Sequence, residues 1–271
     1  MKRFSLFITF FLFVLQINAQ VIKLEINPTS RPKGSLRLSD LVEQVGYIPL
    51  ETKNNCIVGN IVDFDVSENY IVVYVAQTKE VFLFSRTGRF VSKIGRQGQS
   101  GAEYLEPNGV FIDELKKCVY LLDYRKLLMY DFTGKHLNTF SFIDNEGIVV
   151  GSSLAYLDNQ FITGAMSGRK ADDFVYKIWN STMKLVKQGV KAVSVDVKGG
   201  ATQVVVGRIS CYIYRGLPHM KESSLNDTLY YVNKNNEFIP KYIINCGRYS
   251  WTAEEQGDTN NFYDYPHNDL L

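Results

Sequence analysis

Four aspartates stand at the ends of strand-like runs, where carboxylates could meet around a divalent cation. They are Asp63, Asp65, Asp113 and Asp123. Carboxylate oxygens are the ligands that hard divalent cations prefer, and a bound cation can activate water for hydrolysis. Asp65 and Asp113 occupy equivalent positions just before a turn, however, and aspartate is a common turn former. The pattern therefore favours structural aspartates and no metal, with a divalent-metal-dependent hydrolase or lyase as the alternative.

No other catalytic arrangement is evident in the chain. The three histidines, His136, His219 and His267, have no metal-ligand spacing, and no Gly-x-Ser-x-Gly motif is present. Cysteines occur at four positions without a Cys-x-x-Cys pair. We therefore predict no catalytic residues and no cofactor, and we expect most of the cysteines to be small core residues.

Binding is the better supported alternative, because the longest loops carry charged and aromatic side chains. These loops are Gly95–Pro107, Gly164–Asp173 and Arg215–Asp227. Recognition residues concentrate on loops held by a rigid scaffold. The candidates for binding a protein, peptide or glycan are Arg96, Gln97, Glu103, Tyr104, Arg125, Arg169, Lys170, Arg215 and His219. A charged rim without a ligand is the alternative for each of them.

A recurring strand–turn–strand pattern indicates the scaffold that positions these loops. It occurs at Phe84–Phe90, Tyr130–His136, Trp179–Leu185 and Val232–Phe238. The turn positions Gly88, Gly134, Met183 and Asn236 are 46, 49 and 53 residues apart. This is close to the roughly 40–50-residue period of β-propeller blades. We predict an all-β fold, a β-propeller with four recognisable four-stranded blades.

Alternation of apolar and polar residues places four strands in each repeat. The first repeat gives Ile61–Asp65, Tyr70–Val75, Val81–Ser85 and Phe90–Ile94, and the second gives Gly109–Asp113, Val119–Asp123, Leu127–Asp131 and Leu137–Phe142. The third gives Ser153–Leu157, Phe161–Gly164, Phe174–Asn180 and Leu185–Gly189, and the fourth gives Gln203–Val206, Ile209–Tyr214, Thr228–Val232 and Phe238–Ile244. In a propeller, the connectors between blades and the loops between second and third strands open on the same face. We predict that this face contains the binding site. The turn at Met183 is expected to differ from the others, because methionine adopts a positive φ only at a cost.

The connector Ile94-Gly-Arg-Gln-Gly-Gln-Ser-Gly-Ala-Glu-Tyr-Leu-Glu-Pro-Asn108 resembles the Gly-x-x-Gly-x-Gly-Pro-Gly-Glu-Tyr/Phe…Pro segment of NHL-like six-bladed propellers. Together with Leu36–Glu51 it is similar to the exported six-bladed β-propeller proteins of Bacteroidetes, over about residues 35 to 250. The departure is Ser100-Gly-Ala102 in place of Gly-Pro-Gly. The resemblance implies fold and compartment more than chemistry. It also implies that the segment around Tyr47–Glu51 forms the outer strand of the last blade.

The N-terminus predicts export. Lys2 and Arg3 precede an apolar run from Phe4 to Leu15, and a small residue, Ala19, precedes Gln20. This run is too short for a membrane span, so residues 1–19 are predicted to be a signal peptide, with no membrane span after cleavage. Gln20 is not the cysteine of a lipoprotein anchor, so a periplasmic or secreted location is expected. An uncleaved anchor is the alternative.

Cleavage removes two of the 30 Lys and Arg residues, leaving 28 against 28 Asp and Glu. A neutral chain without a basic run gives no reason to expect a nucleic-acid partner. We divide the remainder into a linker at 20–35, an incomplete propeller at 36–250, and a polar tail or the start of a truncated blade at 251–271. The sequence contains four repeats, whereas the propellers that its connector resembles have six blades. A fragment of a six-bladed ring is therefore favoured over a closed four-bladed ring. An inactive truncated relic is a further alternative.

Overall fold

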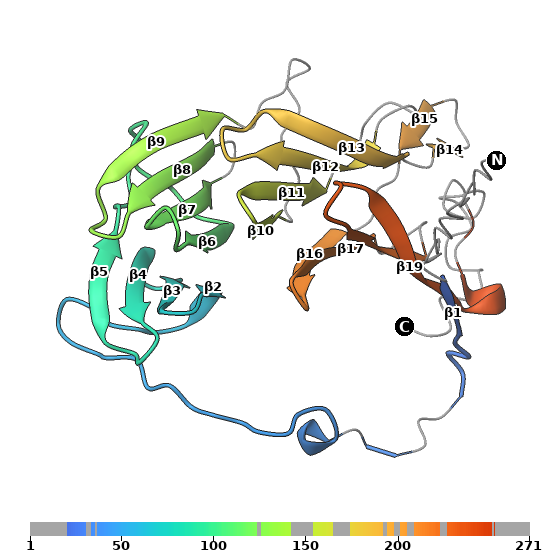
Figure 1. Ribbon diagram of the computed structural model, residues 1–271, viewed down its shortest axis with the longest axis horizontal. Coiled ribbons are helices and arrows are strands. Elements are labelled where there is room, and N and C mark those ends of the chain that lie inside the picture. The colour runs from blue at the N-terminus through green and yellow to red at the C-terminus, as the bar shows by residue number, and fades with distance from the viewer. Residues whose placement is uncertain are drawn as a thin grey trace, which may run out of the picture.

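The computed structural model describes residues 21–30, 34–35, 37–123, 126–141, 154–164, 174–191, 194–197, 201–204, 209–222, 227–250 and 252. Four antiparallel four-stranded sheets follow one another along the chain and are arranged as the blades of a β-propeller. They form an arc in which the first strand of each blade lies toward the centre (Figure 1). The predicted all-β propeller with four blades is confirmed.

Blade 1 consists of β2 (Ile61–Val66), β3 (Tyr70–Val75), β4 (Glu80–Ser85) and β5 (Phe90–Ile94). Blade 2 consists of β6 (Gly109–Asp113), β7 (Cys118–Asp123), β8 (Lys126–Asp131) and β9 (His136–Ser141). Blade 3 consists of β10 (Leu154–Leu157), β11 (Gln160–Gly164), β12 (Phe174–Asn180) and β13 (Leu185–Lys191). Blade 4 consists of β16 (Ile209–Tyr214), β17 (Leu217–Glu222), β18 (Thr228–Val232) and β19 (Phe238–Asn245).

The sequence prediction of strands holds for blades 1 to 3 and is wrong by one strand in blade 4. Residues 203–204, expected to start blade 4, belong to β15 (Ala201–Val204), which pairs with β14 (Ser194–Val197) in a separate hairpin. The second strand of blade 4 is β17, which lies in the predicted Arg215–Asp227 loop. Proline has no backbone N–H to donate, so the presence of Pro218 in the sequence disfavours a strand at this position. In the structure, Pro218 nevertheless pairs with Ile213 of β16.

The turns between the third and fourth strands share one conformation in all four blades. Gly88, Gly134, Met183 and Asn236 all have positive φ, between 59° and 87°. The expectation that the Met183 turn differs is therefore wrong. Asn180 Oδ1 accepts hydrogen bonds from the backbone amides of Thr182 and Lys184, which holds this turn in the same form. These bonds offset the roughly 1–2 kcal/mol that a left-handed residue costs.

Apolar clusters on both sides of blades 1 to 3 explain why the second and third strands of these blades are apolar without alternation. In β3, Val72 and Tyr74 pack toward blade 2, where they meet Val110 and Leu121. The intervening residues of β3 pack on the other side against the segment before blade 1, including Cys56. Similar clusters lie between blades 2 and 3 and between blades 3 and 4. Because both faces of these strands are covered, both must be apolar.

The N-terminal residues contact both ends of the arc. Strand β1 (Ile22–Glu25), within the segment expected to be a linker, pairs in parallel with β19 of blade 4. The chain then runs past η1 (Leu38–Asp40) to blade 1 (Figure 1). There the amide of Glu51 donates to the carbonyl of Gly88, at 2.8 Å. The segment around Tyr47–Glu51 thus contacts blade 1 instead of forming an outer strand of the last blade.

All four cysteines are free. Cys56 and Cys118 are fully buried in apolar clusters, as expected for small core residues, while Cys211 and Cys246 are partly buried.

Candidate functional site

The aspartates of β2 bind the backbone of the neighbouring blade. Asp63 Oδ2 accepts a hydrogen bond from the amide of Val110 at 2.9 Å, and Asp65 Oδ2 accepts one from the amide of Ile112 at 2.8 Å. Burial raises the pKa of both carboxyls, and these hydrogen bonds act in the opposite direction. The two side chains therefore join the innermost strands of blades 1 and 2.

Asp113 and Asp123 also bind protein groups. Asp113 accepts hydrogen bonds from the amide of Lys116 at 3.0 Å and from the hydroxyl of Tyr156 in blade 3 at 2.5 Å. Burial alone would raise the pKa of Asp113, but the hydrogen bonds from Tyr156 and Lys116 hold it below its usual value. Asp123 accepts from the amides of Leu105 and Glu106, at 2.9 and 3.0 Å.

These contacts support the structural interpretation of all four aspartates, although only Asp113 bonds to a turn as predicted. Within the described ranges, no group of three or more His, Cys, Asp or Glu side chains is placed to hold a metal ion. The alternative of a metal-dependent hydrolase or lyase therefore receives no geometric support from these residues.

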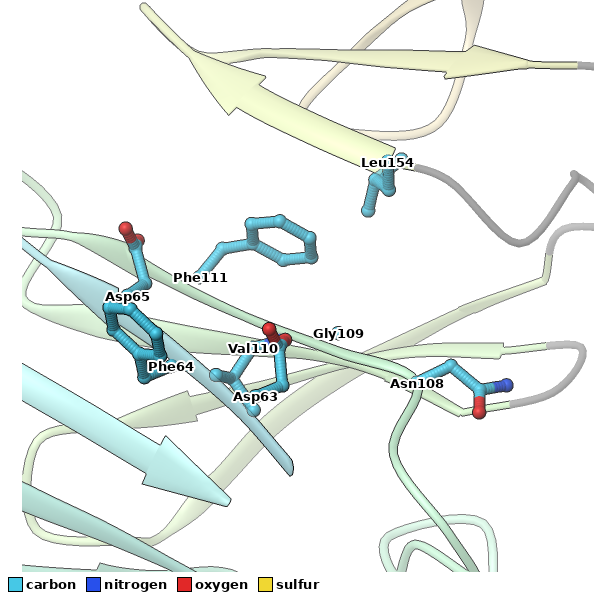
Figure 2. A pocket seen from close by; sticks show the side chains of 8 residues that line it. All are labelled: Asp63, Phe64, Asp65, Asn108, Gly109, Val110, Phe111 and Leu154. Carbon is cyan, nitrogen blue, oxygen red and sulfur yellow. The ribbon is translucent and has the colours of Figure 1, made fainter. Parts of the chain in front are cut away.

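A small hollow lies beside the innermost strands, with a volume of about 160 Å³. Figure 2 shows Phe111 extending toward Leu154 of blade 3, with Asp63 and Asp65 on the neighbouring strand. Pockets for small organic ligands usually measure about 300–1,000 Å³. Because two of its polar groups already bind backbone amides, this hollow is a weak candidate for a ligand site.

The connector between blades 1 and 2 is a folded loop. Arg96 Nε lies 2.5 Å from Glu103 Oε1, and Glu103 Oε2 accepts a hydrogen bond from the amide of Ser100 at 3.0 Å. Hydrogen bonding to Ser100 lowers the pKa of Glu103 most, and the contact with Arg96 lowers it further, so this pKa lies below its usual value. Gln97 Nε2 donates to the carbonyl of Leu105 at 3.3 Å. Arg96 nevertheless keeps 78% of its side chain exposed.

The structure places the nine predicted binding residues in different environments. Arg96 and Gln97 are exposed on the connector and Glu103 is half-buried beside them. Tyr104 is fully buried between blades 1 and 2, so its predicted role in surface recognition is wrong. Arg125, Arg169 and Lys170 lie outside the described residues.

The last two predicted binding residues, Arg215 and His219, do not lie in a loop on the connector face, because β17 occupies part of the predicted loop. Arg215 lies in the turn between β16 and β17, and successive turns of an antiparallel sheet alternate between its two ends. It therefore lies on the face opposite to the connectors. His219 is buried in β17, with its ring stacked on Tyr212 at a centroid distance of 5.5 Å.

His219 serves packing instead of recognition. Its Nδ1 lies 2.9 Å from the carbonyl of Leu217, so Nδ1 donates, and Nε2 accepts from Lys241 Nζ at 3.1 Å. Burial lowers the pKa of His219, and the positive charge of Lys241 lowers it further. The ring is thus held in its neutral form.

A second hollow, of about 310 Å³, lies between blades 3 and 4 and was not predicted. Its residues come from the turns at Asp158, Gly216 and Lys234 and from the ends of the adjoining strands. The periodicity of the sequence predicts where the turns lie. It does not show that the turns at Asp158, Gly216 and Lys234 lie on the same face of the propeller, because that depends on the correct number and order of strands in blade 4.

The sheets and loops described above define a β-propeller protein. Within this class, the chain belongs to the family described as "Domain of unknown function (DUF4934)", whose model matches residues 19–269. No curated protein matches the sequence.

Two solved structures from Bacteroides are similar. One, described as a "Putative exported protein" from Bacteroides fragilis, has a TM-score of 0.58 and 17% identity, with 83% of this chain and 60% of that chain covered. This chain therefore spans less than two thirds of that protein. A member of the DUF4221 family from Bacteroides vulgatus has a TM-score of 0.46 and 9% identity, with 76% and 62% covered. At these identities the first likeness shows the fold alone. No helix in the described ranges is long and apolar enough to cross a membrane.

Proposed function

We propose that this protein is a non-catalytic, exported binding or scaffold module that recognises a protein, peptide or glycan through its connector face. The observation that carries the proposal is that Arg96 is held in place by the protein and is also exposed to solvent. Glu103 holds the guanidinium at Nε while most of the side chain remains in solvent. Because the loop is already folded, little conformational entropy is lost on binding.

An exposed guanidinium suits a partner that carries a carboxylate. Arginine binds carboxylates through two parallel hydrogen bonds, and these bonds are stronger than those between neutral groups. Among the described residues, Glu103 is the acidic side chain that pairs with Arg96. The terminal guanidinium nitrogens would meet the partner, and the exposed Gln97 beside them would add a hydrogen-bonding group.

Charge reversal at Arg96 tests this proposal. Arg96→Glu is expected to reduce capture of envelope components by the immobilised mature protein by roughly tenfold, because one charge-assisted contact becomes repulsive. Capture is quantified by crosslinking and mass spectrometry. Arg86→Glu is the control, since Arg86 is exposed in the turn between β4 and β5, at the opposite end of blade 1. Equal capture by the wild type and Arg96→Glu would contradict the proposal.

The proposal of export is based on residues 1–19, and the similar structure from Bacteroides fragilis is likewise described as a "Putative exported protein". The mature chain is expected to begin at Gln20. Intact-mass measurement of the protein from the periplasm or culture medium checks this expectation. A mass that retains residues 1–19 in that fraction would show an uncleaved anchor instead.

We also propose that the four blades are related to six-bladed NHL-like propellers. The glycine-rich connector supports this relationship, since its glycine at position 95 has a φ of 59° and the loop folds back through the Gln97–Tyr104 bridge.

A further inference from the structure

The hollow between blades 3 and 4 has apolar walls and a polar rim. Ile162, Pro218 and Val232 are buried among its lining residues, with Leu157 and Leu217 half-buried beside them. Asp158, Gln160 and Lys234 carry polar groups at the hollow. Its volume of about 310 Å³ reaches the range of small-ligand pockets, which begins at about 300 Å³.

Three polar side chains at this hollow are not engaged by other groups of the described protein. In the part of the chain that the structure describes, the side chains of Asp158, Gln160 and Lys234 make no hydrogen bond or ion pair. At the connector, by contrast, Arg96 pairs with Glu103, and Asp123 binds two backbone amides. Asn233, which also lines the hollow, accepts hydrogen bonds from two turn amides and is therefore a structural residue.

The two opposite charges come from different blades. Asp158 belongs to the turn between β10 and β11 of blade 3, and Lys234 belongs to the turn between β18 and β19 of blade 4. A ligand that lies across the junction between the blades would meet a carboxylate from one side and an ammonium group from the other. Buried Ile162 and Val232 offer apolar contact between them.

We propose that this hollow binds a short apolar peptide with free termini. Asp158 receives the terminal ammonium group, Lys234 receives the terminal carboxylate, and the apolar wall receives a side chain. The amide of Gln160 hydrogen-bonds the peptide group. This inference goes beyond the proposed function, because these turns lie at the end of the blades opposite to the connectors.

Calorimetric titration of the full mature protein with the dipeptide alanyl-leucine tests the inference. Saturable binding is expected, and N-acetylation or C-terminal amidation of the dipeptide is each expected to weaken it by roughly tenfold, because each modification removes one charge-assisted contact. Asp158→Asn should bind the free and acetylated dipeptides equally. Lys234→Gln should bind the free and amidated dipeptides equally.

The variants are chosen to leave the fold intact. Asp158 has a φ of 48°, a conformation that asparagine tolerates well. Lys184→Gln is the matched control, because Lys184 is exposed in the corresponding turn of blade 3 and does not line the hollow. Arg96→Glu should bind the dipeptide as the wild type does, which separates this site from the connector face. Absence of saturable binding to the wild type, or unchanged affinity in both Asp158→Asn and Lys234→Gln, would overturn the inference.

Discussion

Replacement of Tyr104 with alanine is expected to lower the free energy of unfolding by about 3–5 kcal/mol, the range for large aromatic residues cut back in a core. Tyr104 is fully buried, although it lies in a connector loop. Its ring packs in the cluster that joins blades 1 and 2, with Val81, Val110 and Tyr130. Burial also raises the pKa of its hydroxyl, so the side chain stays neutral. Alanine would leave a cavity between two blades.

Urea denaturation followed by circular dichroism measures this change. Arg96→Ala is the control, because Arg96 is exposed on the same loop and surface substitutions usually change stability by no more than about 0.5 kcal/mol. Tyr104→Phe keeps the ring and should retain most of the stability. A Tyr104→Ala protein as stable as Arg96→Ala would contradict the buried position of this side chain.

Replacement of Asp123 with alanine is expected to cost about 2 kcal/mol or more, because it leaves two backbone amides without their acceptor. Asp123 is buried at the end of β7 and binds the amides of Leu105 and Glu106 with separate oxygens. Lys126 Nζ lies 3.8 Å from the same carboxylate. One side chain therefore fastens the connector to blade 2.

Amide hydrogen exchange gives the specific measurement. The amides of Leu105 and Glu106 should exchange faster in Asp123→Ala, and Asp123→Asn, which retains one acceptor oxygen, should fall between this variant and the wild type. Glu106→Ala removes an exposed carboxylate from the same loop and should leave both amides protected. Unchanged exchange in Asp123→Ala would show that the connector is held by other contacts.

The positions of most strands could be predicted because they depend on neighbouring residues. Apolar runs such as Tyr70–Val75 and turn residues such as Gly88 and Gly134 act within a single hairpin. Their period of nearly 50 residues reveals the blades. The second strand of blade 4 differs from the prediction, because Pro218 makes the sequence of β17 unlike that of a strand. The pairing of Pro218 with Ile213 is visible only in the folded sheet.

The sequence by itself determined the β-propeller class and the four blades. The tertiary structure decided which candidate residues reach solvent together. Tyr104 and His219 are buried because neighbouring strands and blades cover them, and Arg215 lies at the opposite end of its blade because β17 is a strand. The hollow at Asp158 and Lys234 forms only when blades 3 and 4 pack side by side. Contacts between blades, such as those of Asp63 with Val110 and of Asp113 with Tyr156, join residues more than 40 positions apart, beyond the reach of the local alternation that predicts a strand.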